Sequence, residues 1–167
     1  PNEIVWSHFI SYLIGLITSD GSLVKRGGAV IISSKDKSHL EKIRDLVSVI
    51  ITGTYMPISE EHKTIEDKDF ITYKYRITSM NFYQFCTSIG LMPNKTKILN
   101  SLTIPDEFFS DFLRGILDGD GNYNVRYRIV NNRKISYFYI RLTSGSKAFL
   151  EWLNNECYRL IGVKGTV

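Results

Sequence analysis

The chain has 167 residues, of which 43% are hydrophobic, so it can bury a core and wholesale disorder is excluded. The 21 Lys and Arg outnumber the 17 Asp and Glu, and the resulting net charge of +4 suits a polyanionic partner without requiring one. Cys86 and Cys157 lie far apart without metal-ligand spacing, which argues against a zinc site and a disulfide framework. The longest apolar run, residues 9–17, is too short to cross a bilayer, so we expect a soluble, intracellular protein with no membrane partner.

A repeat of ten residues organises the chain. Residues 12–21 read YLIGLITSDG and residues 112–121 read FLRGILDGDG, at a spacing of 100 residues. Both contain an aromatic residue, a leucine, a glycine, two aliphatic residues and a final Asp-Gly. Apolar residues at helical spacing precede the end of each repeat, so we predict two amphipathic helices that end at Gly21 and Gly121.

The segments that follow the two repeats also correspond. After the first repeat we predict a strand at 29–34, a helix at 36–50, strands at 55–58 and 73–78 separated by a charged loop, and a helix at 81–89. After the second repeat we predict strands at 122–130 and 135–144 joined by a turn at 131–134, and a helix at 146–160. The second half then lacks a strand and a helix that the first half has. Either the molecule is naturally shortened or the chain is a truncated or cleaved piece, in which case a companion fragment would complete the second half.

A glycine in the middle of each predicted helix indicates close packing between the two helices, because a mid-helix glycine costs about 1 kcal/mol relative to alanine. The small residues expected to face each other are Gly15, Ser19, Gly115 and Gly119. This packing would place Asp20 and Asp120 side by side at two negative helix ends, where they repel each other unless a divalent cation lies between them. Mg²⁺ suits such oxygen ligands best.

Two other interpretations of the acids compete with a metal site. A single Asp-Gly after a helix is usually only a turn, but its duplication favours a function. A calcium loop is the second alternative, since Asp118, Asp120 and Asn122 match the first ligands of an EF-hand. That pattern fails where Tyr123 replaces the required glycine and Ile129 replaces the bidentate glutamate.

The two decapeptides resemble the paired signatures of the LAGLIDADG homing endonucleases, in the monomeric form that carries both motifs in one chain. The resemblance implies an α+β fold of two pseudo-symmetric αββαββα halves packed through the motif helices. Residues 1–100 would form the first repeat and residues 101–167 the second, apparently incomplete one. The resemblance also implies an intron-encoded protein, located in the prokaryotic cytoplasm or in an organelle. Such a protein would cut both strands of double-stranded DNA at a long, asymmetric site.

The resemblance also implies roles for particular residues. The last acid of each family motif binds metal, which makes Asp20 and Asp120 the expected catalytic metal ligands, and the carbonyl of Ser19 or Gly119 an additional one. Mg²⁺ is the expected cofactor, with Mn²⁺ as a substitute and Ca²⁺ as an ion that binds without supporting cleavage. The family has a basic or amide side chain near the metals, and Lys35, which follows Ser34 at a strand end, is the candidate for it.

Strand alternation predicts a DNA-binding face, because side chains at every second position share one face of a sheet. The expected polar row comprises Asn122, Asn124, Arg126, Arg128, Tyr137, Tyr139, Arg141 and Thr143 in the second half, and Lys74, Arg76 and Thr78 in the first. Their neighbours, such as Tyr123, Val125, Phe138, Ile140, Tyr75 and Ile77, form a core-like row. Expected phosphate contacts are Lys25, Arg26, Lys95 and Lys97, with Ser34 nearby.

Each of these rows could also be an ordinary solvated sheet face, and it is the metal motif that favours DNA. The family resemblance leaves a different class of function open, because the same fold serves in intron RNA maturases and in DNA-binding regulators that do not cut. A nuclease made inactive by an incomplete second half is a third interpretation.

Overall fold

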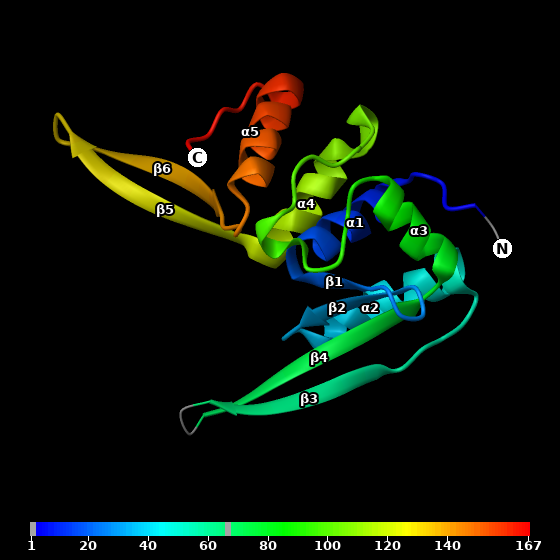
Figure 1. The fold of residues 1–167 in the computed structure, drawn as a ribbon. Coiled ribbons are helices and arrows are strands. Elements are labelled where there is room, and N and C mark those ends of the chain that lie inside the picture. The colour runs from blue at the N-terminus through cyan, green and yellow to red at the C-terminus, as the bar shows by residue number, and fades with distance from the viewer. Residues whose placement is uncertain (1–2, 66–67) are drawn as a thin grey trace.

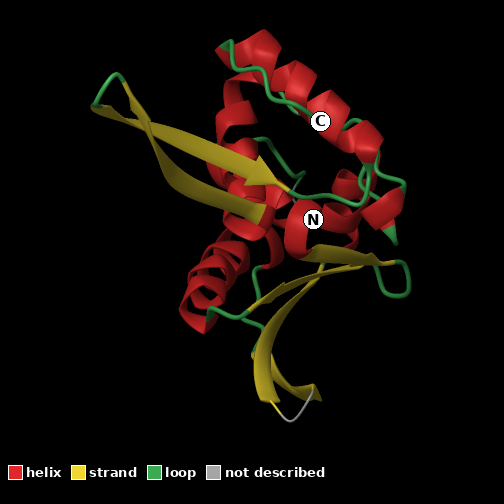
Figure 2. Ribbon diagram, turned by 90° about the vertical axis from the view of Figure 1, so that its left-hand side faces the viewer, coloured by secondary structure: helices red, strands yellow, loops and turns green. Residues whose placement is uncertain are grey.

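The computed structural model describes residues 3–65 and 68–167, and it has an α+β architecture (Figures 1 and 2). Helices α1 (His8–Asp20) and α4 (Phe109–Asp120) lie side by side at the centre of the molecule. A four-stranded sheet extends from one side of this helix pair and a β-hairpin extends from the other. The predicted fold class and the packing through the two motif helices are therefore confirmed.

Both motif helices end where the sequence predicts. Helix α1 begins after Ser7, whose side chain accepts a hydrogen bond from the backbone N–H of Ile10 at 3.2 Å. The short 3₁₀ turn η3 (Asp106–Phe108) follows Pro105 and leads into α4. Gly21 and Gly121 end the helices in an extended conformation, so each helix passes directly into a strand rather than into a left-handed cap.

The first half contains a sheet in the order β1-β2-β4-β3, with every neighbouring pair antiparallel. Its strands are β1 (Gly21–Val24), β2 (Ala29–Ser34), β3 (Ile58–Ile65) and β4 (Lys68–Thr78). The predicted strand at 55–58 is wrong, and so is the charged loop after it over its described residues, which form β3 and the beginning of β4. Residues 66–67 of that loop lie outside the described residues. The paired segments 59–64 and 68–71 form the largely solvent-exposed end of this hairpin, so their pairing does not need an apolar face.

Helices α2 (Lys37–Val47) and α3 (Met80–Ser88) complete the first half, and the π-helical turn η1 (Ser48–Thr52) continues α2. The buried sheet residues that join the core are Leu23, Val30, Ile32, Tyr75 and Ile77, and the helices contribute Leu40, Ile43, Phe82 and Cys86. The alternation predicted for β4 is confirmed, because Tyr75 and Ile77 are buried whereas Arg76 and Thr78 are exposed. Among the described residues, no helix combines the length and the apolarity needed to span a bilayer.

The second half consists of β5 (Gly121–Val130), β6 (Arg133–Leu142) and α5 (Lys147–Ile161). The hairpin turn is shorter than predicted, because only Asn131 and Asn132 lie outside the ladder, at φ values of 50° and 58°. Two residues with positive φ are typical of a type I′ hairpin turn, which tolerates asparagine.

The apolar row of this hairpin is not a core, which corrects the sequence prediction. Tyr123 is 77% exposed and Ile140 is 57% exposed. The corresponding residues of the first half, Leu23 and Val30, are buried in the shared core with α1 and α3. In the second half these side chains instead line an open hollow of about 370 Å³ against α4. The difference arises because α3 and β4 have no counterpart among the described residues of the second half.

Candidate active site and nucleic-acid interface

Helices α1 and α4 approach each other through their glycines. A Cβ atom placed on Gly15 would stand 2.9 Å from the Cα of Gly115 and would collide with the carbonyl oxygen of Phe112. A Cβ on Gly119 would collide with the side chain of Ser19 and lie 3.0 Å from Oδ2 of Asp20. The small residues therefore allow backbone contact, and that contact brings the C-terminal end of one helix beside that of the other.

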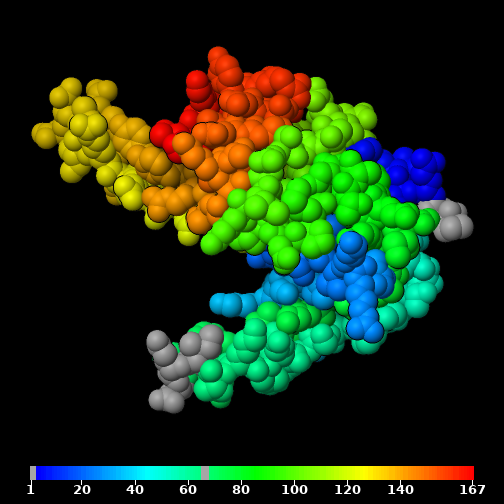
Figure 3. Space-filling model, viewed as in Figure 1, coloured from blue at the N-terminus to red at the C-terminus, as the bar shows by residue number. Residues whose placement is uncertain are grey.

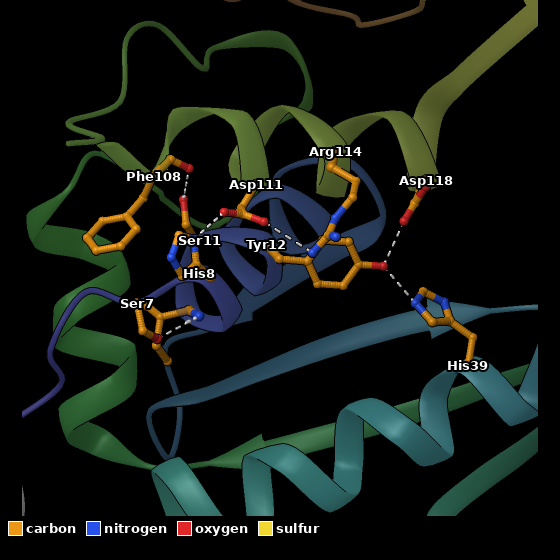
Figure 4. Close-up of polar contacts among 10 residues, drawn as sticks. Ser7, His8, Ser11, Tyr12, His39, Phe108, Asp111, Arg114 and Asp118 are labelled. Carbon is orange, nitrogen blue, oxygen red and sulfur yellow. Dashed lines mark hydrogen bonds and ion pairs between the residues drawn. The ribbon is translucent and has the colours of Figure 1, made fainter. Parts of the chain in front are cut away.

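Polar contacts between the two halves fix the rotation and register of this helix pair (Figure 4). Ser11 is buried, and its hydroxyl donates a 2.8 Å hydrogen bond to the carbonyl oxygen of Phe108. Nδ1 of His8 lies 2.7 Å from Oδ2 of Asp111. Both contacts lie towards the N-terminal ends of the helices. The register that they set determines where the two acids meet.

Asp20 and Asp120 occupy the last positions of α1 and α4. Partial burial and the negative charge of Asp120 raise the pKa of Asp20. The positive charge of Lys95 opposes this effect only in part. Burial also raises the pKa of Asp120, again opposed by Lys95. Two carboxylates with raised pKa values at two negative helix ends form a site at which added positive charge is stabilising.

Lys95 supplies one positive charge to this site from the connection between the halves. It belongs to the 3₁₀ turn η2 (Lys95–Lys97), and its side chain is only 7% exposed. Its ammonium group donates a short hydrogen bond to the carbonyl oxygen of Gly21, the residue after Asp20. Burial lowers the pKa of Lys95, and the charges of Asp120 and Asp20 partly offset that effect.

Lys95 is therefore buried beside the acids, unlike the exposed Lys97, and its predicted phosphate contact stays a prediction. A sequence signal for its burial exists, because Leu91 and Leu99, four residues to either side, are both buried. The backbone N–H of Leu99 donates to the carbonyl of Lys95, so this spacing has a structural basis.

Lys35, the predicted basic residue of the site, is exposed, and its ammonium lies 5.9 Å from the centre of the Phe70 ring.

A narrow cavity of about 20 Å³ lies beside each acid. The cavity at Asp20 is also lined by Ser33, Ser34, His39 and Asp118. The cavity at the other acid is lined by Asp120, Thr18, Ser19, Thr143, Ser144 and Phe149, with further apolar residues. Each space is about the size that one water molecule needs, and hydroxyl groups line both.

The donor set fits a hard cation that DNA would help to bind. The described part of the chain contains no group of three or more His, Cys, Asp or Glu side chains that could hold a metal ion. Asp20 and Asp120 thus offer carboxylate oxygens only, and the rest of a coordination shell would come from waters, phosphate oxygens and backbone carbonyls. Ser19 and Gly119 lie in the last helical turns, where carbonyls lack intrahelical partners. Mg²⁺ commonly binds through one or two carboxylates in this way.

The predicted DNA-contacting residues lie on exposed strands and turns. Cross-strand pairs join Asn122 with Arg141, Asn124 with Tyr139, and Arg126 with Tyr137, so these residues share one face of the hairpin. Arg126 also stacks over Tyr139 at 5.5 Å from the ring centre. The remaining exposed members of the predicted set are Lys25, Arg26, Arg76, Thr78, Lys97, Arg128 and Thr143.

Lys74 and Ser34 are only partly exposed, and Lys74 forms an ion pair with Glu61 at 2.8 Å. Figure 3 shows a broad hollow between the projecting hairpin of β5 and β6 and that of β3 and β4. In Figure 1, helices α1 and α4 lie between these two hairpins, and Asp20 and Asp120 are the last residues of the two helices.

Comparisons with known proteins agree with this arrangement. Residues 10–90 match the LAGLIDADG-like domain family. The homing endonuclease I-WcaI, in a structure bound to its DNA recognition sequence, superposes with a TM-score of 0.63 at 17% identity over 99% of this chain and 72% of that one. I-DmoI in complex with DNA and Mn superposes with a TM-score of 0.55 at 18% identity over 95% of this chain and 80% of that one. The resemblance of this chain to the LAGLIDADG homing endonucleases is thus confirmed.

Two further relatives carry names other than endonuclease. DUF199/WhiA of Thermatoga maritima superposes with a TM-score of 0.55 at 14% identity, over 95% of this chain and 46% of that one. The RNA polymerase subunit Rpo1C of Methanocaldococcus jannaschii is 30% identical over 152 residues, which are 90% of this chain. This chain spans only 16% of that relative's length. The fold is therefore shared by proteins with different names, and activity must be argued from the site.

Proposed function

We propose that this chain is a site-specific double-strand DNA endonuclease that hydrolyses phosphodiester bonds with the help of a divalent cation. One observation carries the proposal: Asp20 and Asp120 converge at the ends of two helices in backbone contact, with the buried ammonium of Lys95 beside them. Two acids and one desolvated lysine match the requirements of phosphodiester hydrolysis better than those of a passive binding surface.

Each group has a distinct role in the proposed reaction. Asp20 and Asp120 would hold the cation at the helix ends, where their raised pKa values indicate that added positive charge is stabilising. Mg²⁺, or Mn²⁺ in its place, would supply charge neutralisation and a more acidic water when bound. The Lys95 ammonium stabilises the negative charge that develops on the phosphate, since it is buried and held by the carbonyl of Gly21.

DNA binding is proposed for the exposed polar faces on both sides of the helix pair. Arg126, Arg128 and Arg141 on the hairpin, with Arg76 on β4, offer side chains suited to guanine edges and phosphates. The two faces carry different residues, so each would recognise a different half of an asymmetric target. A monomer would then suffice for both halves, and a companion fragment that covers the apolar face of the hairpin is a further proposed partner.

The test is cleavage of a DNA library by the wild-type chain in Mg²⁺, Mn²⁺ or Ca²⁺, with binding measured in parallel. Cutting at one long site in Mg²⁺ and Mn²⁺, and binding without cutting in Ca²⁺, is the expected result. Asp20→Asn should bind the same site in Ca²⁺ and lose cleavage. Cleavage that persists in the variant, or in a chelator, would contradict the proposed site.

A non-cutting nucleic-acid-binding protein is the second candidate, and the shared fold of DUF199/WhiA favours keeping it. An intron maturase or a DNA-binding regulator would use the same exposed faces without turnover at the acids. Competition between duplex DNA and a structured intron RNA separates these functions. Tight binding of either nucleic acid without cleavage in any cation would replace the endonuclease by this candidate.

A further inference from the structure

Three polar side chains from both halves form a network next to one of the two acids (Figure 4). The hydroxyl of Tyr12 on α1 donates a 2.8 Å hydrogen bond to Oδ2 of Asp118 on α4. The same hydroxyl oxygen lies 2.8 Å from Nε2 of His39 on α2, which donates to it when the tyrosine proton points at Asp118. The guanidinium of Arg114 covers the tyrosine ring at 4.6 Å from its centre.

Among the described residues, two members of this network line the cavity beside Asp20, and none lines the cavity beside Asp120. His39 and Asp118 both line the cavity of about 20 Å³ that Asp20 and Ser34 also line. Tyr12 lies two helical turns before Asp20 on the same helix. Burial and the hydrogen bond to Asp118 raise the pKa of the Tyr12 hydroxyl, which therefore keeps the proton that it donates.

The internal repeat identifies the equivalent positions on the other side. The motif helices correspond at a spacing of 100 residues, which pairs Tyr12 with Phe112 and Asp118 with Thr18. Helices α2 and α5 correspond through their N-caps, because Asp36 accepts from the backbone N–H of His39 as Ser146 accepts from that of Phe149. The counterpart of His39 is therefore Phe149.

The equivalent cluster is apolar. Phe112 and Phe149 are both buried, and each packs against Trp152 at ring-centre distances of 6.0 and 5.6 Å. The hydroxyl of Thr18 donates back to the carbonyl of Ile14 in its own helix at 2.7 Å. The cavity beside Asp120, also about 20 Å³, thus has Thr18 and Phe149 in place of Asp118 and His39.

We propose that Tyr12, His39 and Asp118 are positioning residues for the Asp20 half of the site alone, so that the two DNA strands are cut by non-equivalent half-sites. This inference rests on the proposed endonuclease function. The network holds the last turn of α4 against α1 and α2 and fixes two polar side chains at the edge of the water-sized space beside Asp20. On the Asp120 side, the helices contribute Thr18 and Ser19, whose hydroxyls donate to carbonyls of their own helix, and the apolar Phe149. Loss of the network should therefore affect one strand selectively.

The experiment measures the cleavage rate of each strand separately in Mg²⁺, with the target found by the library and each strand carrying its own label. Tyr12→Phe removes one oxygen atom and reproduces the residue at position 112. His39→Phe reproduces the residue at position 149, and Asp118→Asn keeps the shape of the side chain. We expect each variant to slow the same one strand about tenfold, with the other strand changed less than about twofold, so that nicked DNA accumulates.

Ser11→Ala is the matched control, because it removes another hydroxyl hydrogen bond between the halves, at the opposite end of the helix pair. It should reduce stability at least as much as Tyr12→Phe while leaving the ratio of the two strand rates unchanged. An unchanged ratio in the network variants, or equal slowing of both strands, overturns the inference and leaves the endonuclease intact. If the wild type cuts neither strand, the proposed function fails and this inference fails with it.

Discussion

Gly15 and Gly115 lie against each other across the central helix pair, so closely that a Cβ on either one would stand 2.9 Å from the Cα of the other. This contact joins the two halves of the chain and sets the distance between the helix ends that carry the acids. The repeat of the glycine in both motifs thus has a steric cause. Catalysis and folding of the proposed enzyme depend on the same close approach.

The first prediction concerns that contact. Gly15→Ala gains intrinsic helix propensity but places a methyl group into the backbone of α4, so it should lower the free energy of unfolding by about 3 kcal/mol or more. Chemical denaturation measures this change. Ser110→Ala, at an exposed position of α4, is the control and should change stability by less than about 0.5 kcal/mol. Equal effects of the two substitutions would contradict the proposed role of the glycine contact.

The second prediction uses the raised pKa of Asp20. Because its pKa in the folded state lies above the ordinary value of 3.8, the folded protein binds this proton more readily than the unfolded chain does. The free energy of unfolding of the metal-free protein should therefore fall as pH rises through the region above 3.8. The Asp20→Asn substitution should remove this fall in the free energy of unfolding, because the asparagine side chain does not titrate.

At pH 7 and without metal, the Asp20→Asn variant should be more stable than the wild type by less than about 1 kcal/mol, since the partly buried Asp20 is still accessible to solvent, which screens its charge. The difference should shrink on acidification, and Mg²⁺ with target DNA should stabilise the wild type more than the variant. Thermal unfolding at several pH values measures all three effects. A variant less stable than the wild type at neutral pH would refute the argument.

The third prediction separates Lys95 from its neighbour Lys97. Lys95→Met keeps the length of a buried side chain and removes its charge, so cleavage should fall by about a hundredfold or more while DNA binding persists. Lys97 is exposed, and Lys97→Met should change the cleavage rate less than about threefold. Single-turnover kinetics with bound DNA distinguish the two. Similar losses in both variants would indicate a general charge effect instead.

The fourth prediction tests the polar face of the hairpin. Arg126→Ala should weaken DNA binding roughly tenfold and, if its contact is to a phosphate, reduce the slope of log affinity against log salt concentration by about one. Lys164→Ala, an exposed charge after α5, provides the control and should leave both quantities nearly unchanged. Affinity titrations at several salt concentrations give the answer, and equal behaviour of the two variants would argue against the hairpin as a DNA-binding surface.

The fifth prediction compares equivalent apolar residues of the two halves. Val30 is fully buried, so Val30→Ala should cost about 2 kcal/mol, whereas Ile140 is 57% exposed and Ile140→Ala should cost less than about 1 kcal/mol. Denaturation of both variants makes the comparison. A cost at Ile140 that equals the cost at Val30 would mean that the apolar face of the hairpin is covered in solution.

Local patterns in the sequence were sufficient to predict much of this fold. The 3.6-residue periodicity before Gly21 and Gly121 defines the two motif helices and their ends, and the alternation of Tyr75, Arg76 and Ile77 defines a strand with one buried face. The pattern of the charged segments 59–64 and 68–71 does not predict their strands, because a ribbon that is largely exposed on both faces has no apolar alternation.

The sequence by itself determined the paired helices, the positions of Asp20 and Asp120 and the small residues that let the helices meet. Periodicity is a property of neighbouring residues, and an internal repeat is visible when two segments of the sequence are compared. Only the tertiary structure decided that Lys95 is buried beside the acids, that Tyr12 links His39 to Asp118, and that the apolar face of the hairpin is open. The physical reason is that burial and hydrogen bonding depend on segments distant in the chain, whose placement only long-range packing fixes.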